Sequence, residues 1–237
     1  MLLAIPLLLA GAVMLLLEWR RPRRRLERVD RFRRRALALS AIQVAVAFLG
    51  ARFLDPWLQD LRWFSAEPLG LVGGTVMGYL GITFLWYWWH RARHEVPFLW
   101  RTLHQVHHSP SRLELLTTYY KHPLESATNV VLGGIAMYWV LGLTPAQSAG
   151  VALLCGIAEF FYHWNVPTPH WLGYLIQRPE SHCVHHERGR HASNYADLPV
   201  WDALFGTLDN PVSDDVDCGF GEAETRLRDM LGFREVA

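Results

Sequence analysis

Two short segments of the chain carry the same histidine triplet, 78 residues apart. They are LHQVHH, residues 103–108, and SHCVHH, residues 181–186, and their histidines are His104, His107, His108, His182, His185 and His186. Residues three and four apart share one face of a helix, so each triplet, if it is helical, presents its imidazoles in one direction. Neutral imidazole is the commonest metal ligand in proteins. The two triplets therefore predict a metal site.

A third cluster raises the number of candidate ligands. His90 and His94 are four residues apart in HRARH, residues 90–94. One ion needs only three or four such ligands, so eight histidines in three segments are too many for one ion and about right for two. Imidazole suits iron, zinc and copper. We predict a two-metal site to which each triplet contributes, with the intervening chain bringing 182–186 back beside 104–108.

Apolar blocks must position these segments. The chain has 237 residues, of which 51% are hydrophobic, and it contains 11 Trp. A helix needs about 20 residues to cross a bilayer core of about 30 Å. Five blocks approach that length, and we interpret them as about four to five transmembrane helices: 2–17, 36–54, 68–89, 127–143 and 148–164. The predicted fold is all-α, a polytopic membrane protein with a cytosolic helical cap that carries the dimetal site.

The turn-like sequence Thr144-Pro145-Ala146-Gln147 separates the last two blocks, which predicts a tight hairpin. The first block is followed, not preceded, by its positive charges, so it is interpreted as an uncleaved span and not as a signal peptide.

An arginine-rich segment sets the orientation. Residues 20–35 hold ten Arg against Glu27 and Asp30 and lie between two apolar blocks. Cytoplasmic loops carry such an excess of Lys and Arg, and the segment can contact anionic lipid head groups. We predict that this loop is cytoplasmic and that it does not bind nucleic acid. The same topology places all the histidine clusters near the cytoplasmic face, in a membrane that we expect to be the bacterial inner membrane.

The motifs together resemble the fatty acid hydroxylase/sterol desaturase superfamily of integral-membrane oxygenases. HRARH, LHQVHH and SHCVHH occur in that order around the hairpin. TTYYKHPLE (117–125), FYHWNV (161–166) and HASNYADLPVWDALFGTLDNP (191–211) are similar to further segments of that family. The resemblance covers residues 75 to 211, and it implies three parts: N-terminal spans with the Arg-rich loop (1–66), a catalytic domain (67–211) and a cytosolic tail (212–237).

The resemblance implies a chemistry and a ligand set. Family members use two non-haem irons to activate O₂, and they hydroxylate or desaturate a C–H bond of a lipid such as a fatty acyl chain or a sterol. Zinc can replace iron on isolation. Carried over by position, eight histidines are implied as catalytic ligands: His90, His94, His104, His107, His108, His182, His185 and His186. His163 is implied as a ninth metal ligand, although Pro167 stands where some relatives have a further histidine.

Other polar residues are candidates for supporting the ligands. Glu159 lies in an apolar block four residues before His163, and an intramembrane carboxylate is a functional candidate. We predict that it orients a ligand histidine or binds metal, the alternative being a glutamate paired within the bundle. The remaining candidates for residues behind the ligands are His122, Glu125, Asn165 and Asp202. His170 and His191 have no histidine at ligand spacing and are expected to be solvated or interfacial.

The expected partners follow from the chemistry. A lipid substrate would come from the bilayer. The three cysteines form no CxxC pair, and no GxGxxG unit or fused haem domain is evident. Electrons are therefore expected from a separate carrier or reductase, docked on residues 20–35 or on the basic residues Arg91, Arg93 and Arg101.

Two other functional classes stay open at this point. A membrane metal-binding or transport protein would use the histidines without redox chemistry, but it should place ligands along a path across the bilayer. A bis-histidine haem protein would place single histidines on opposed spans. Neither arrangement is the one that the triplets indicate.

Overall fold

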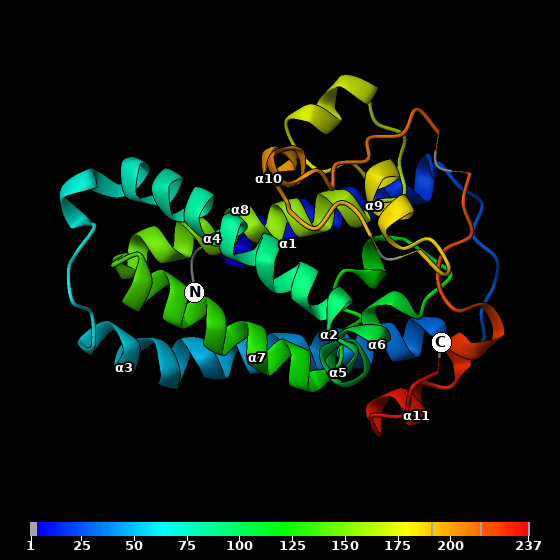
Figure 1. The fold of residues 1–237 in the computed structure, drawn as a ribbon, viewed down its shortest axis with the longest axis horizontal. Helices are drawn as coiled ribbons and strands as arrows, with labels where there is room; N and C mark the ends of the chain where they lie inside the picture. Colours follow the sequence, from blue (N-terminus) through cyan, green and yellow to red (C-terminus); the bar gives the residue numbers. More distant parts are fainter. Residues whose placement is uncertain (1–3, 191, 214, 237) are drawn as a thin grey trace.

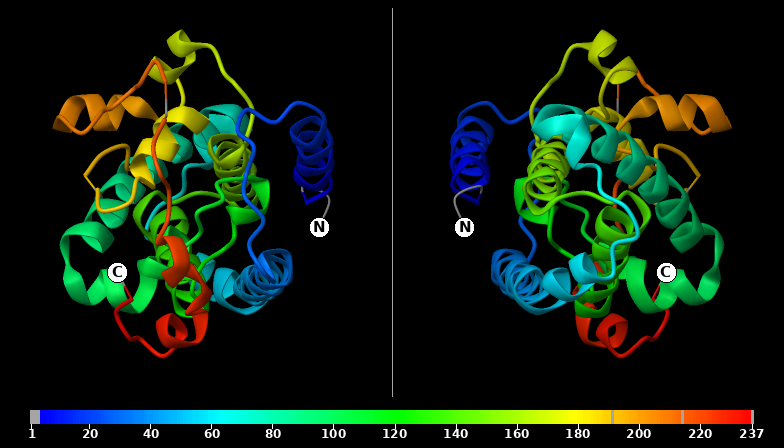
Figure 2. Two further views of the ribbon diagram at one scale, coloured as in Figure 1. Left: turned by 90° about the vertical axis from the view of Figure 1, so that its right-hand side faces the viewer. Right: turned by 90° about the vertical axis from the view of Figure 1, so that its left-hand side faces the viewer.

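A bundle of long helices forms one part of the protein, and short helices and loops form the rest. The computed structural model describes residues 4–190, 192–213 and 215–236, so His191 lies outside the described residues. Within them there is no β-strand, and one isolated bridge joins Glu187 to Cys218. The all-helical prediction is confirmed for this part of the chain. The long helices are α1 (Ala4–Arg20), α2 (Phe32–Leu49), α4 (Gly70–Glu95), α7 (Pro123–Gly134) and α8 (Pro145–His163). They run along the long axis of the molecule (Figure 1) and are seen nearly end-on in Figure 2.

Two of the helical segments are long and apolar enough to cross a membrane. α2 continues through the π-helical η1 (Gly50–Leu54) into α3 (Asp55–Asp60), so that Phe32–Asp60 is continuous over 29 residues. η2 (Glu67–Leu69) leads into α4, and Glu67–Glu95 also has 29 residues. Most side chains of both segments are not buried by protein, which suits helices that face lipid. The remaining apolar blocks also lie in helices, namely α1, α7 with the π-helical η5 (Ile135–Val140), and α8.

The predicted hairpin lies between η5 and α8. Thr144 caps α8, because its hydroxyl accepts from the Gln147 N–H while the Gln147 side chain accepts from the Thr144 N–H. The same Gln147 amide donates to the carbonyls of Ala66 and Gly70, which ties the hairpin to the start of α4. Gly74 permits this approach, since a Cβ there would lie 2.1 Å from Gln147 Nε2.

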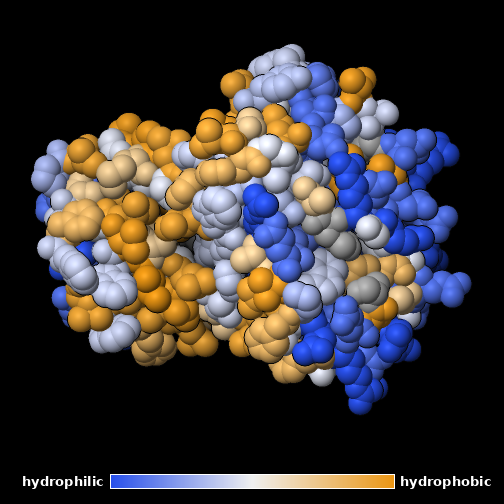
Figure 3. All heavy atoms as spheres, viewed as in Figure 1, coloured by the Kyte–Doolittle hydropathy of each residue, from blue (hydrophilic) through white to orange (hydrophobic). Residues whose placement is uncertain are grey.

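The short helices gather at the polar end of the molecule. They are α5 (Pro97–Leu99), η3 (Trp100–His104), α6 (Gln105–His108), η4 (Leu115–Thr117), η6 (His170–Tyr174), α9 (Pro179–His185), α10 (Pro199–Phe205), η7 (Gly221–Thr225) and α11 (Leu227–Leu231). Figure 3 shows hydrophobic residues dominating the half that contains α3, and hydrophilic residues gathered at the opposite end around α11. The molecule is thus divided along its length into an apolar half and a polar half.

The C-terminal segment and the arginine-rich loop both pack on this polar end. Met230 of α11 is fully buried in a cluster with Phe32 and Val106. The Gln105 side chain donates to the carbonyl of Arg234. In the arginine-rich loop, the Arg24 N–H and carbonyl both bind the side chain of Asn165. The C-terminal segment therefore packs on the first histidine triplet, and the arginine-rich loop is held at the end of α8.

Candidate metal centre

The structure brings all nine predicted histidines together in two groups. Within each group, one nitrogen of every member lies within 4.8 Å of the corresponding nitrogens of the others. The first group is His90, His94, His104, His108 and His185, and the second is His107, His163, His182 and His186. Each triplet is divided between the groups. In all three clusters the histidines four residues apart belong to the same group. In each triplet the middle histidine, His107 or His185, belongs to the other group.

Local sequence signals place these segments. Helix α4 ends at Glu95 because Val96 precedes Pro97, and a residue before proline is disfavoured in helical conformation. Val96 is extended, with φ −103° and ψ 109°, and the chain turns back so that the first triplet faces the end of α4. Pro179 opens α9 after an extended Arg178, since proline suits the first position of a helix. His163 is the last residue of α8.

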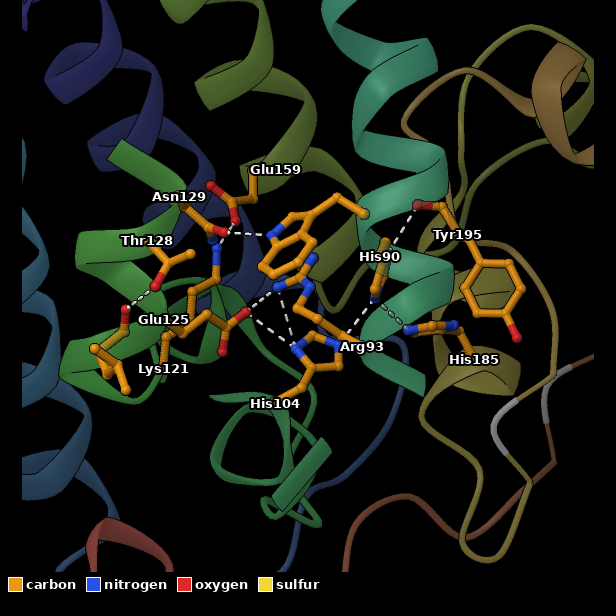
Figure 4. Close-up of polar contacts among 12 residues, drawn as sticks. His90, Arg93, His104, Lys121, Glu125, Thr128, Asn129, Glu159, His185 and Tyr195 are labelled. Atoms are coloured by element: carbon orange, nitrogen blue, oxygen red, sulfur yellow. Dashed lines mark hydrogen bonds and ion pairs between the residues drawn. The ribbon is translucent and has the colours of Figure 1, made fainter. Parts of the chain in front are cut away.

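Hydrogen bonds fix which nitrogen each histidine offers in the first group. His90 Nδ1 lies 2.8 Å from the Tyr195 carbonyl oxygen, and His185 Nδ1 lies 2.6 Å from that of Ser193 (Figure 4 shows the first). A carbonyl oxygen only accepts, so each Nδ1 carries the proton, and in a neutral ring Nε2 has the free lone pair. These two Nε2 atoms are 3.1 Å apart.

A third ring lies beside these two. His104 Nδ1 lies 3.0 Å from Glu125 Oε1 and 3.3 Å from a guanidinium nitrogen of Arg93, and its Nε2 lies 3.0 Å from that of His90. The lone pairs of His90 and His185 thus face each other with no proton to place between them, and His104 Nε2 joins them when Glu125 accepts the Nδ1 proton. Protonating one ring instead would put a charge where His104 and His185 are at most 1% exposed, and burial disfavours the charged form. The arrangement fits a cation held among the three Nε2 atoms.

The second group is similar. His182 Nε2 lies 3.1 Å from both His163 Nε2 and His186 Nε2. His163 Nδ1 donates over 2.8 Å to the main-chain carbonyl of Glu159. Burial lowers the pKa of His107 and of His182 well below its ordinary value, and the neighbouring histidines lower it further. These imidazoles are therefore in the neutral form, which is the form that binds metal.

The spacing tests whether metal ions fit. A protein-bound transition metal lies about 2.0–2.1 Å from a histidine nitrogen, so two such ligands at a right angle are about 3.0 Å apart. The observed Nε2 separations are 3.0–3.1 Å in both groups. The donor sets, five imidazoles and four, fit one ion each.

Two of the predicted supporting residues hold ligands in place, Glu125 directly and Asp202 through the main chain. Glu125 is fully buried and binds both His104 Nδ1 and the Arg93 guanidinium (Figure 4). Asp202 acts at one remove, because its carboxylate accepts from the N–H groups of Tyr195 and Ala196 and thereby fixes the carbonyl that holds His90. Metal-binding histidines usually donate their second N–H to such groups.

The other supporting candidates lie elsewhere. The carboxylate of Glu159 pairs with Lys121 and lies in neither histidine group, and the residue orients His163 through its main-chain carbonyl. His122 caps α7, its Nδ1 accepting from Leu124 N–H. Asn165 holds the arginine-rich loop. His170 lies 3.1 Å from the Asn210 carbonyl oxygen and is in neither group.

One predicted docking residue is corrected by the structure. Arg93 is 7% exposed and paired with the fully buried Glu125, so it cannot present its charge to a partner protein. The sequence does not reveal this pair, because 32 residues separate its members. It also gives no signal for the carbonyls of Tyr195 and Ser193, since every residue type has a carbonyl.

Comparison with known proteins decides the family. The profile of the fatty acid hydroxylase family matches residues 75–207, which include all nine histidines. The chain belongs to the fatty acid hydroxylase family. No solved structure matches it.

Several relatives of this fatty acid hydroxylase family member are lipid hydroxylases by name. Alkylglycerol monooxygenase from Homo sapiens is 30% identical over 161 residues, covering 65% of this chain and 32% of that protein. Ornithine lipid hydroxylase from Rhizobium tropici is 31% identical over 186 residues, covering 74% of this chain and 55% of that protein. Cholesterol 25-hydroxylase-like protein from Danio rerio is 32% identical over 183 residues, covering 73% and 70%. The chain thus spans about a third of the first relative and about half of the second.

Proposed function

We propose that the protein is a membrane-bound di-iron oxidoreductase that uses O₂ and external electrons to hydroxylate or desaturate a C–H bond of a lipid. The observation that carries the proposal is the convergence of nine histidines, from α4, η3, α6, α8, α9 and its C-terminal boundary, into two adjacent groups. Family membership and the names of the relatives support the reaction class. A metal-binding protein without redox chemistry is the second candidate, since the same groups would hold ions.

The ligand roles follow from the two groups. We assign one iron to the five-histidine group and one to the four-histidine group. When bound, the two irons would supply the O₂-derived oxidant that attacks an unactivated C–H bond, which no amino acid side chain can do. The chain keeps the ligand imidazoles neutral by burial. It orients His90, His104, His163 and His185 through carbonyl or carboxylate acceptors.

We further propose that the apolar half lies in the bilayer with four to five spans. Two helical segments qualify by length and hydropathy, and α1, η5 and α8 expose further apolar side chains beside them. The arginine-rich loop packs at the histidine end of the bundle, so the positive-inside rule places the metal centre on the cytoplasmic face. A bacterial inner membrane would suit this arrangement.

A separate electron carrier would complete the cycle. The exposed arginines of the arginine-rich segment, together with Arg101, form the candidate docking surface, and an acidic carrier would complement them: Arg20, Arg21, Arg25, Arg28, Arg31, Arg33, Arg34 and Arg101. Anionic lipid head groups are the alternative occupants of the loop arginines.

Lipid mass spectrometry of cells that express the chain tests the function. Wild-type protein should convert a lipid to a product with one more oxygen or two fewer hydrogens. His107→Ala, which removes a second-group ligand, should abolish the product, whereas the control His170→Ala should retain it. A metal-binding protein without redox chemistry would leave the lipids unchanged in all three cultures while still copurifying with metal.

A further inference from the structure

An apolar groove runs along the bundle toward the metal centre. Its volume is about 660 Å³, which is within the range of small-molecule sites. Residues of α1, α2, η1, α4, α7 and α8 are among those that line it. Small ones keep it open, namely Ala47 on α2, Ala51 on η1, and Ala149 and Ala152 on α8. A groove of this character in the apolar half of the molecule suits an alkyl or acyl chain.

A second, smaller chamber separates the groove from the histidines. Its volume is about 160 Å³, and both histidine groups contribute to its wall: His90 and His104 from the first, His107 and His182 from the second. The rest of the wall is largely polar. Figure 4 shows Lys121, Glu159, Asn129 and Arg93 gathered beside His104. A chamber of this size admits a small polar group with the atoms next to it, and not a whole chain.

The two cavities adjoin each other. Five residues line both of them: Gln43, Trp86, Asn129, Cys155 and Glu159. At this junction Gln43 Oε1 is buried and accepts no hydrogen bond from the described residues. A buried acceptor without a partner is costly, so this oxygen is available to a hydrogen-bond donor that enters from the groove.

The basic side chains of the chamber are already paired. Arg93 is bound to Glu125, and Lys121 is bound to Glu159. A third carboxyl group, that of Asp197, also lines the wall. Among the described residues that line the chamber, no side-chain cation is left over to neutralise a phosphate or a free carboxylate. An anionic head group would instead meet the carboxyl groups of Glu159 and Asp197, so the side chains of the wall suit a hydrogen-bond donor better than an anion.

We propose that the substrate is a lipid with a neutral hydroxyl or amide group, that this group enters the chamber first and donates to Gln43 Oε1, and that the carbon oxidised lies within a few bonds of it. The tail of the lipid stays in the groove. This inference rests on the proposed function and adds its regiochemistry. A substrate that entered tail first would place an apolar chain end against Lys121, Glu159 and Arg93, and would leave its polar group among apolar residues.

Product mapping tests the regiochemistry. Iron-loaded, chemically reduced protein in detergent is given three compounds with the same alkyl chain: a terminal alcohol, the corresponding carboxylate and the plain alkane. Fragmentation mass spectrometry should place the new oxygen or double bond near the hydroxyl end of the alcohol, with little turnover of the other two. Oxidation in the middle or at the far end of the chain would overturn this inference alone. Failure of every lipid tested, including a total lipid extract, would count against the proposed function instead.

Two variants test the residues. Gln43→Met should raise KM for the alcohol about 2- to 12-fold, the effect of losing one hydrogen bond, with bound iron unchanged. It should leave KM unaltered for the matching methyl ether, which has no donor. A merely structural effect would change both substrates alike, and that result would contradict the assignment of Gln43.

Ala47→Trp should narrow the groove. Ala45 lies on the same helix but does not line the groove, so Ala45→Trp serves as the control. The first should raise KM more for long-chain alcohols than for short ones, and the second should not. The same KM change in both variants would show that the groove does not hold the alkyl chain.

Discussion

Asp202 offers a sharp test of how the fold supports the metal centre. Its carboxylate is 1% exposed and accepts three hydrogen bonds: from Tyr195 N–H at 2.8 Å, from Ala196 N–H at 3.0 Å and from the Thr207 hydroxyl at 2.7 Å. The Tyr195 carbonyl in turn holds His90. Replacing Asp202 should therefore disturb the first histidine group without touching any ligand.

The magnitudes follow from counting these bonds. Asp202→Ala leaves the N–H groups of Tyr195 and Ala196 without an acceptor, whereas the Thr207 hydroxyl can still bind the Tyr87 hydroxyl. Each orphaned donor costs about 1–3 kcal/mol, so the free energy of unfolding should fall by about 2–5 kcal/mol after partial relief by water. Asp202→Asn keeps the shape and one acceptor oxygen, and it should cost about 1–2 kcal/mol. Loss of such support usually weakens metal affinity about 10- to 100-fold. Asp202→Asn, which destabilises the fold less, is therefore the variant to use for measuring metal affinity.

The assay is titration of the metal-free protein with ferrous iron under anaerobic conditions, comparing Asp202→Asn with the control Asp209→Asn. The control carboxylate pairs with Arg190 at the surface. We expect one of two binding steps to weaken in Asp202→Asn and both to persist in the control. Equal weakening of both steps, or no change in either, would refute the proposed route from Asp202 through Tyr195 to His90.

Three further predictions concern stability. Removing metal with a chelator should lower the midpoint of thermal unfolding, because an ion present at 100 times its Kd stabilises the folded state by about 2.7 kcal/mol. Adding iron back should restore the midpoint. An unchanged melting curve would contradict a metal site in the folded protein. Glu125→Gln should destabilise the protein by about 3–5 kcal/mol by leaving Arg93 buried and unpaired, as measured by denaturant unfolding, and Arg93→Met in the same chain should recover part of the loss. Gly74→Ala should lower the free energy of unfolding by about 1–3 kcal/mol through overpacking against Gln147. At Gly73 an added Cβ would lie 3.4 Å from the nearest atom, so Gly73→Ala should not lower the free energy of unfolding in the same measurement.

The histidine groups were predictable because their signal lies in residue type and helical spacing. His104 and His108 are four apart and share a group, as do His182 and His186. Spacing did not show that His107 belongs to the second group, because that division depends on where the end of α8 places His163. The apolar blocks likewise predicted helices, since continuous hydrophobic runs of that length have few other structures.

The supporting contacts were less accessible to sequence. Glu159 was predicted to orient a ligand histidine or to bind metal, with pairing inside the bundle as the alternative. Its carboxylate pairs with Lys121, and its main-chain carbonyl accepts from His163 Nδ1. Arg93 looked like a surface charge beside two histidines, yet helix packing buries it against Glu125. Such outcomes depend on tertiary proximity between residues far apart in the chain. The interruptions of the long helices by the π-helical η1 and η5 also have no evident sequence signal.

Two ions held side by side by two separate histidine groups would give the protein a definite metal content. Elemental analysis of anaerobically iron-loaded protein measures it in the wild type, in His90→Ala from the first group and in His182→Ala from the second. We expect two irons per chain in the wild type and one in each variant. A single iron in the wild type, or wild-type iron content in both variants, would contradict it.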